Sequence, residues 1–544
     1  MTNTTRYLSA AAYLNPQYAN LVIGDLVASH RAVVPSVGID LGVIIRHCLY
    51  ARKIQLIRDI LLTIFLVLGL IFAPPQIIII LIVAFVLGFL PSVEWERRSI
   101  GVKVLAGGAV AAGLFAIGFL VLIIYLGLSG QGARVDVTVI AFLLLTAVTQ
   151  VAYTYNKYRA LIDKLGPDAD PAPFPRLDHR VESRIAEVEA AQSGNLTLYS
   201  GENPFIGTGK WDRVWSIAIE LDRAQETAQE PWARSRSRGY VPIDPVELHQ
   251  VIRERLLRLR DPALPENERL SALAVDDHVV GEGERRWDEP LVDPDRKVPY
   301  SRISREAIEA LIRHPQAGLR YYQWVSVSDE GQAVWSGNEE VIGRADQEIA
   351  ASAFVYVAVE GGMFYLEFVT TVLPPIYRRY HLVDLLPKIS SGKFTAKVWL
   401  DAARNVFKDV ISAPFRAAGT LRQMWHDHRS FQEEAASVDE VLFGDVGARI
   451  SVRELGAARA PHTYIQRLDA AKYTKLVERL ITDTVLDFLE DKGVDTTAYR
   501  ASATSVINNG LTISGGTFSG PVAAGAGAKA QVNVSAAQPT TAAG

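Results

Sequence analysis

The chain has 544 residues, which fits two to four domains, and its 49% apolar and 21% charged residues exclude a wholly disordered protein. Its 56 basic and 60 acidic residues give a net charge of -4, which argues against a nucleic-acid-binding protein with a broad basic face. The single cysteine, Cys48, excludes an intrachain disulfide, and this composition is typical of a reducing compartment.

The first 50 residues contain no apolar core of the kind that a signal peptide needs, and residues 1–53 are predicted to be a cytoplasmic N-terminal region. Residues 54–155 are overwhelmingly apolar and predict a transmembrane domain. Four hydrophobic segments are expected, at about 57–73, 76–92, 102–129 and 135–153. Pro74 and Pro75 separate the first two, because proline interrupts a helix. Both are short, so they either cross the bilayer or form a re-entrant hairpin.

The charges around these segments predict their orientation. Lys and Arg occur before the first segment, between the second and third, and after the fourth: Arg46, Arg52, Lys53, Arg58, Arg97, Arg98, Lys103, Lys157, Arg159 and Lys164. Because such residues are retained in the cytoplasm, both termini are predicted to be cytoplasmic. No charged residue lies in the middle of a segment, which disfavours a transporter and leaves Gln150 as the nearest polar candidate.

The remaining chain is predicted to be cytoplasmic. A proline-rich linker at 156–179 leads into an α+β domain at 180–385, in which alternating apolar residues predict an antiparallel sheet. Gly361 and Gly362 form its clearest hairpin turn. A helical region is expected at 386–500, and its first helix, at about 394–410, either packs on its own domain or lies on the membrane. We favour packing.

The loop 200–210 contains Gly207, Gly209 and Lys210, which could hold a phosphate through backbone amides and an ammonium group. A P-loop, however, needs glycine and Ser or Thr at the positions of Pro204 and Trp211. A long turn between antiparallel strands is therefore favoured.

No catalytic set, metal site or cofactor is predicted. His426 and His428 are two residues apart, so they point to different sides of a helix, and further zinc ligands are missing. Cys48 adjoins the membrane region, and the other histidines are scattered, so no nucleophile and base can be paired. An enzyme is disfavoured.

The C-terminal segment at 501–534 is rich in Gly and Asn and has no charge up to Ala528, which predicts short β strands. Such strands either stack between copies of the chain or form a mobile tail, and residues 535–544 are expected to be disordered. The residues expected to carry self-association are Ile507, Asn509, Leu511, Ile513 and Phe518.

Three short segments, 6–14, 198–207 and 508–520, resemble a family of multi-pass membrane proteins of actinobacteria that has no known activity. This resemblance implies a bacterial plasma-membrane location and transfers no catalytic residue. The tail is also similar to bacterial amyloid-type signalling motifs, which recruit partners by stacking.

The favoured interpretation is a membrane-anchored cytoplasmic scaffold or interaction protein that self-associates. Its expected partners are the lipid bilayer, further copies of the chain and an unidentified cytoplasmic protein, with no nucleic acid. The alternative is a membrane-associated enzyme or small-ligand binder that uses the loop 200–210.

Overall fold

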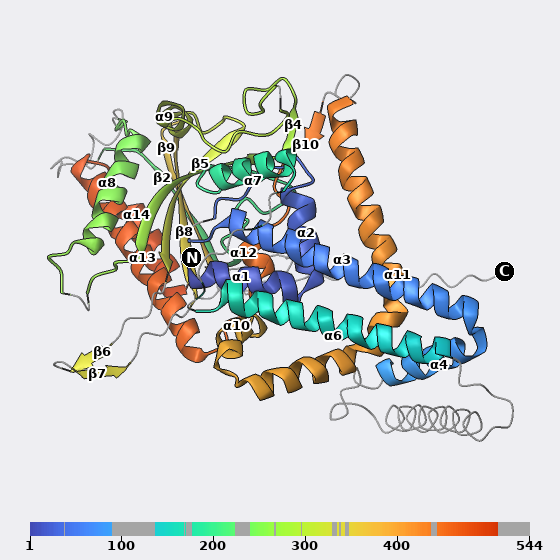
Figure 1. Ribbon diagram of the computed structural model, residues 1–544. Helices are drawn as coiled ribbons and strands as arrows, with labels where there is room; N and C mark the ends of the chain where they lie inside the picture. The colour runs from blue at the N-terminus through green and yellow to red at the C-terminus, as the bar shows by residue number, and fades with distance from the viewer. Residues whose placement is uncertain are drawn as a thin grey trace, which may run out of the picture. The chain divides into compact units, whose positions relative to one another are not determined.

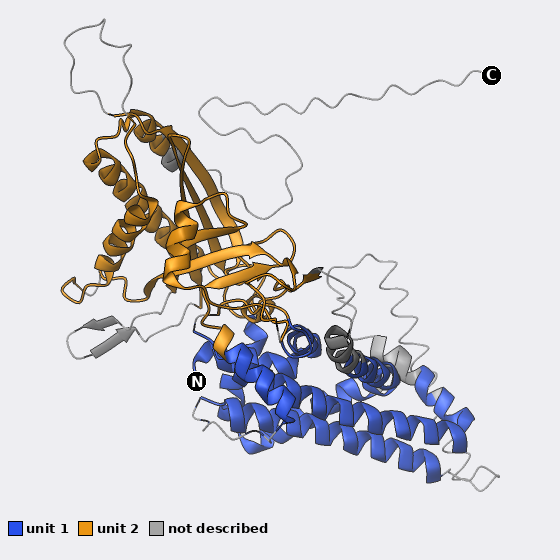
Figure 2. Cartoon of the chain, turned by 90° about the horizontal axis from the view of Figure 1, so that it is seen from above, with its two compact units in different colours: residues 1–30, 38–189, 377–442 blue, residues 31–37, 190–376, 443–544 orange. Residues whose placement is uncertain are grey.

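The computed structural model describes residues 1–36, 38–89, 137–167, 169, 174, 177–223, 240–265, 268–294, 296–328, 334–336, 339–342, 348–436 and 443–509 (Figure 1). The chain divides into two compact units (Figure 2). Unit 1 comprises residues 1–30, 38–189 and 377–442, and unit 2 comprises residues 31–37, 190–376 and 443–544. Each unit is therefore assembled from separate stretches of the sequence.

Unit 1 is helical. Its helices are α1 (Asn3–Leu14), α2 (Pro16–Leu26), α3 (Leu41–Phe72), α4 (Pro74–Phe89), α6 (Val137–Leu165), α7 (His179–Ala191), α10 (Leu382–Leu385) and α11 (Ser391–Ala436), with 3-10 turns η5 (Arg378–His381) and η6 (Leu386–Lys388) around α10. Polar side chains cap the early helices: the Asp40 carboxylate accepts a hydrogen bond from the backbone N–H of Val43, at the start of α3. Helices α3 and α6 lie side by side (Figure 1).

Among the described residues, α3 and α6 are the two helices that are long and apolar enough to cross a membrane. The structure therefore supports two candidate spans where the sequence predicts four. The predicted break at Pro74 is confirmed, since α3 ends at Phe72 and α4 begins at Pro74. The helix before it begins at Leu41, well before the predicted start near residue 57. The predicted segment at 102–129 lies outside the described residues.

Helix α11 packs against α3, α4 and α6. Val410 and Ala413 are buried with Leu62, Ile77 and Phe142 in the apolar core of unit 1. The helix is thus packed, but against helices of the predicted transmembrane domain and not against the cytoplasmic domain to which the sequence assigned it. The helix continues through Pro414 to Ala436, and Figure 1 shows it as two arms at an angle, as expected when a proline ring displaces the preceding turn.

Unit 2 is built on a six-stranded sheet. The strands are β1 (Leu196–Tyr199), β2 (Lys210–Glu220), β3 (Leu273–Glu282), β5 (Leu319–Ser328), β8 (Ala350–Glu360) and β9 (Met363–Leu373), in the order β1-β3-β5-β8-β9-β2. Two short ladders pair β4 (Glu284–Arg286) with β10 (Phe443–Asp445), and β6 (Val334–Ser336) with β7 (Glu339–Ile342).

The topology corrects two predictions and confirms a third. The sheet is mixed and not purely antiparallel, because β1 pairs with β3 in parallel. Strands β1 and β2 lie at opposite edges, so the loop 200–209 is not a turn between paired strands. The β8–β9 hairpin is present as predicted, and Gly361 and Gly362 supply its positive φ angles of 59° and 81°.

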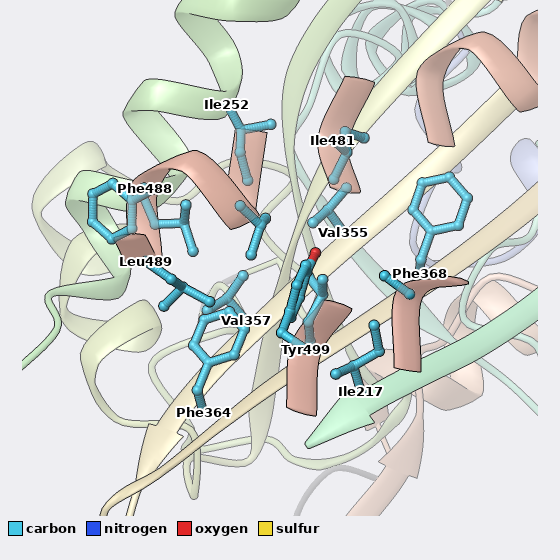
Figure 3. Close-up of a cluster of buried hydrophobic side chains, with 14 of the residues drawn as sticks. Ile217, Ile252, Val355, Val357, Phe364, Phe368, Ile481, Phe488, Leu489 and Tyr499 are labelled. Atoms are coloured by element: carbon cyan, nitrogen blue, oxygen red, sulfur yellow. The ribbon is translucent and has the colours of Figure 1, made fainter. Parts of the chain in front are cut away.

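Helices α8 (Pro245–Leu257), α13 (Tyr464–Asp491) and α14 (Thr497–Asn509) pack on one face of the sheet. Figure 3 shows the core between them, where Phe364 and Phe368 of β9 meet Ile481, Leu489 and Tyr499. The shorter helices of unit 2 are η4 (Arg258–Arg260), α9 (Arg305–Arg313) and α12 (Val452–Leu455).

The Gly/Asn-rich segment begins differently from the prediction. Residues 506–509, including Ile507 and Asn509, form the end of helix α14 and not a β strand. Helix formation here extends a helix whose Tyr499 and Ala503 are already buried against the sheet. Leu511, Ile513 and Phe518 lie outside the described residues.

Candidate anion-binding cavity

Unit 1 contains a cavity of about 720 Å³. That volume is within the range of small-molecule sites. Its walls come from the α1–α2 junction, from α3, α6 and α11, and from the segment around Arg379 and Leu382. Helix α6 supplies five lining residues: Gln150, Tyr153, Thr154, Lys157 and Tyr158. They recur at intervals of three and four, so they share one face of the helix.

Helix α11 presents a second face of the same kind, and its members are mostly charged. The lining residues from this helix are Lys397, Asp401, Arg404, Asn405, Lys408, Asp409 and Arg416. With Arg58, Lys157 and Arg379, the cavity has seven basic side chains against two acidic ones. The cavity is therefore strongly electropositive.

Two of the seven cations belong to a buried ion-pair network. The Arg58 guanidinium lies 2.7 Å from Asp59 and 3.4 Å from Asp409, and Arg416 lies 2.8 Å from Asp59 and 3.1 Å from Asp409. The Gln150 side-chain amide donates to Asp409 at 2.6 Å. These charges satisfy one another and fix α3, α6 and α11 at one end of the cavity.

A third cation, Lys397, lies 3.4 Å from Asp401, whose carboxylate also accepts the Tyr158 hydroxyl. The other four are different. Lys157, Arg379, Arg404 and Lys408 make no ion pair with any residue that the structure describes. The Lys157 ammonium lies 5.1 Å from the centroid of the Tyr158 ring, a cation–π contact that leaves its N–H donors available.

Gln150 adds an acceptor to this set of donors. Its side chain is only 2% exposed, and its carbonyl oxygen, Oε1, has no hydrogen-bond partner within the described part of the chain. A buried amide oxygen without a partner is unfavourable unless something donates to it. The cavity thus offers cations for an anion and an acceptor for a hydroxyl group.

The loop residues predicted from the sequence lie in unit 2, and their donor groups already make hydrogen bonds within the chain. The backbone N–H groups of Gly207 and Gly209 both donate to the Glu454 carboxylate, at 2.9 and 2.8 Å. The Lys210 ammonium donates to the backbone carbonyl of Arg459 at 3.0 Å. Burial raises the pKa of Glu454, and the two amide hydrogen bonds oppose that rise. The chain's own carboxylate takes the position that a phosphate would need.

Sequence reasoning missed the cavity, although its signal is present. It considered Gln150 for a transport pathway, treated Lys157 as a topology marker and assigned residues 394–410 to an amphipathic helix without a ligand site. Reading residues 150–158 and 397–408 at intervals of three and four would have placed polar groups on one face of each helix. Only the tertiary structure shows that these two faces meet.

Residues 214–519 match the AbeC-like domain family, which covers more than half of the chain. The chain belongs to this family. The matched region includes Arg379, α11 and most of the sheet of unit 2, while α3 and α6 precede it. No curated protein and no solved structure matches the chain. The actinobacterial origin and the amyloid-type tail remain predictions.

Proposed function

We propose that this AbeC-like protein is a membrane-associated binding protein whose unit 1 holds an anionic ligand of the phosphate class in its basic cavity. The observation that carries the proposal is the convergence of four cations that have no ion-pair partner in the described chain. Like charges that share a cavity repel one another, so an anion bound among them lowers the energy of the site. Arginine and lysine are the side chains that proteins use most for phosphate.

The position of the cavity along the helices supports a membrane location. On α3, Gln55 and Arg58 line the cavity, and exposed apolar side chains follow, among them Ile64, Leu68 and Ile71. On α6 the exposed apolar residues Ile140, Leu144 and Val148 come first, and the cavity residues follow. Both helices therefore reach the cavity at the end of an apolar stretch, the depth at which lipid headgroups lie.

The membrane proposal retains the four-segment, multi-pass topology with cytoplasmic termini, which rests on the charge pattern of the sequence. Labelling of single cysteines in the connecting loops tests it. The loop 200–210 supports a ligand site less well than the cavity does, because Glu454 already accepts from its amide pair.

The chemistry of the cavity suits either a lipid headgroup or a soluble phosphate, and titration calorimetry on the purified full chain in neutral detergent separates them. The probes are inorganic pyrophosphate and short-chain phosphatidylglycerol. The test variant is Arg404→Gln/Lys408→Gln. The matched control is Lys393→Gln/Arg422→Gln, which removes two charges from the same helix outside the cavity. We expect about thirtyfold weaker binding in the test variant, because it loses two charge-assisted contacts that are each worth on the order of 1 kcal/mol.

Each result has a distinct meaning. Binding of phosphatidylglycerol alone identifies a lipid headgroup, and binding of pyrophosphate alone identifies a soluble ligand. If neither probe binds the unaltered chain, or if the test and control variants bind equally well, the cavity is not an anion site and the proposal is wrong.

A further inference from the structure

The side chain of Gln150 fixes the position of an unused acceptor in the wall of the basic cavity. Its amide nitrogen donates to Asp409 at 2.6 Å, and a carboxylate can only accept, so the nitrogen of the amide lies on that side. The carbonyl oxygen, Oε1, is then the end without a hydrogen-bond partner in the described part of the chain. Because the side chain is buried, a ligand that donates to Oε1 gains free energy.

The hydroxyl groups next to Gln150 on α6 do not supply this donor. Thr146 and Thr154 lie one turn before and one turn after Gln150. The Thr146 hydroxyl donates to the backbone carbonyl of Phe142 at 2.8 Å, and the Thr154 hydroxyl donates to the backbone carbonyl of Gln150 at 2.8 Å. A hydroxyl group has one hydrogen to donate, and both are already used. The donor to Oε1 is left for a bound ligand to provide.

The charge of the cavity restricts the kind of donor that this ligand carries. An ionised phosphate offers acceptors and no hydrogen, so it binds the cations but cannot satisfy Oε1. An ammonium group would meet seven basic side chains against two acidic ones and would be repelled. A hydroxyl group donates without a charge and avoids this repulsion. The chemistry that satisfies both the cations and Oε1 is a phosphate ester with a free hydroxyl group.

Two contacts between α6 and α11 give the spacing of these groups. Gln150 bonds to Asp409, and Tyr158 bonds to Asp401, so eight residues separate the two contacts on each helix. At 1.5 Å per residue, the contacts are about 12 Å apart along the helix axes. Three of the cations without an ion pair fall between them along the two helices: Lys157, Arg404 and Lys408. A hydroxyl at the Gln150 end therefore lies within about 12 Å of a phosphate held by these cations, which suits a small polyol.

We propose that the ligand of this cavity is a phosphate ester of a polyol, whose phosphate binds the cations and whose hydroxyl group donates to Oε1 of Gln150. The inference rests on the anion site proposed above and specifies the class of its ligand. It covers a lipid headgroup of the glycerol or inositol type and a soluble polyol phosphate, because both carry the same two groups. It excludes headgroups with an ammonium group.

Titration calorimetry on the purified full chain tests the proposal with pairs of probes that differ only in their hydroxyl groups. The soluble pair is glycerol 3-phosphate and propyl phosphate, and the lipid pair is short-chain phosphatidylglycerol and phosphatidylpropanol. We expect the probe with hydroxyl groups to bind about fivefold more tightly, which is the usual effect of one hydrogen bond between uncharged groups. Short-chain phosphatidylethanolamine should bind more weakly than phosphatidylglycerol.

Two variants assign the difference to Gln150. Gln150→Met keeps the length of the side chain and removes the acceptor, so it should bind both members of a pair equally well. The matched control is Thr146→Val, which removes another buried polar group from α6 that does not line the cavity. This control should keep the fivefold difference. The comparison of probes on the unaltered chain is independent of how either variant folds.

Each outcome separates this inference from the anion site on which it rests. A difference within the soluble pair alone identifies a soluble polyol phosphate, and one within the lipid pair alone identifies a lipid headgroup. If the probes without hydroxyl groups bind the unaltered chain as tightly as their partners, or if phosphatidylethanolamine binds as tightly as phosphatidylglycerol, the polyol inference is wrong and the anion site stands. A difference that persists in Gln150→Met overturns the role of Gln150. If no probe binds, the anion site itself is wrong.

Discussion

Two histidines of unit 2 show how burial sets the charge of a single residue. His249 is 4% exposed and His278 is 2% exposed. Burial lowers the pKa of each to about 4, against small opposing contributions from the Gln323 side chain for His249 and from the backbone of Pro204 for His278. The His278 ring packs beside the rings of Trp324 and Phe354, with centroids 5.5 and 5.4 Å away. Both side chains are therefore neutral in the folded protein near pH 6.

We predict that unit 2 loses stability as the pH falls from about 6.5 towards 4, because the unfolded chain binds protons at these histidines before the folded chain does. Each pKa unit of difference corresponds to about 1.4 kcal/mol, so the loss is a few kcal/mol. Denaturant unfolding at about pH 7.5 and pH 5 measures it. His278→Phe should flatten this dependence, and an exposed control, His314→Phe, should not. Equal stability at both pH values would contradict the prediction.

At the residue scale, the sequence shows what a side chain is able to do but not what it meets. The glycines of the loop 200–210 do form a pair of amide donors, as a phosphate site requires. The acceptor is Glu454, about 245 residues further along the chain. No local pattern connects those positions, so the occupied state of the loop could not be predicted.

At the scale of elements, the sequence predicted the features that local signals determine. It did not predict the pairing of strands that are far apart in the chain. Paired glycines between two alternating segments determine the β8–β9 hairpin, and paired prolines determine the end of α3. The parallel pairing of β1 with β3, in contrast, joins strands separated by more than 70 residues. Nothing within either strand specifies that partner.

The order of the hydrophobic segments predicts which loops face the cytoplasm. Cysteine labelling tests this topology, and the chain has only one cysteine of its own. Cys48 is fully buried, so a membrane-impermeant maleimide should not label the unaltered chain. Gln131→Cys, in the predicted outer loop, should be labelled in intact cells, and Lys393→Cys should be labelled only after the membrane is opened. Labelling of Lys393→Cys in intact cells would reverse the proposed topology.

At the scale of the whole molecule, the helices at 386–500 divide between the two units. Helix α11 belongs to unit 1, and α13 belongs to unit 2. An amphipathic pattern shows that a helix has a face to bury, but not which surface will cover it. Which helices belong to which unit could therefore be determined only from the tertiary structure.

The C-terminal segment carries the prediction of self-association. We expect native mass measurements in mild detergent to show an oligomer for the full chain and a smaller species for a chain that ends at Asn509. This end point keeps α14 and its buried Ala503, so that the loss of mass reports on the tail and not on a damaged core. Uncharged strands rich in Gly and Asn associate edge to edge. The same mass for both chains would rule out assembly through residues 510–522.

Each unit is assembled from separate stretches of the sequence, so some of its parts are synthesised well before the parts that cover them. Strand β9 is complete at Leu373, and α8, which covers part of the same face, has already been made. Phe364 and Phe368 still lack α13, which begins at Tyr464 and ends at Asp491. At ordinary translation rates that wait lasts on the order of ten seconds. Throughout this interval the nascent chain displays an uncovered apolar sheet, and a ribosome-associated chaperone would have its greatest effect on the yield of this protein here.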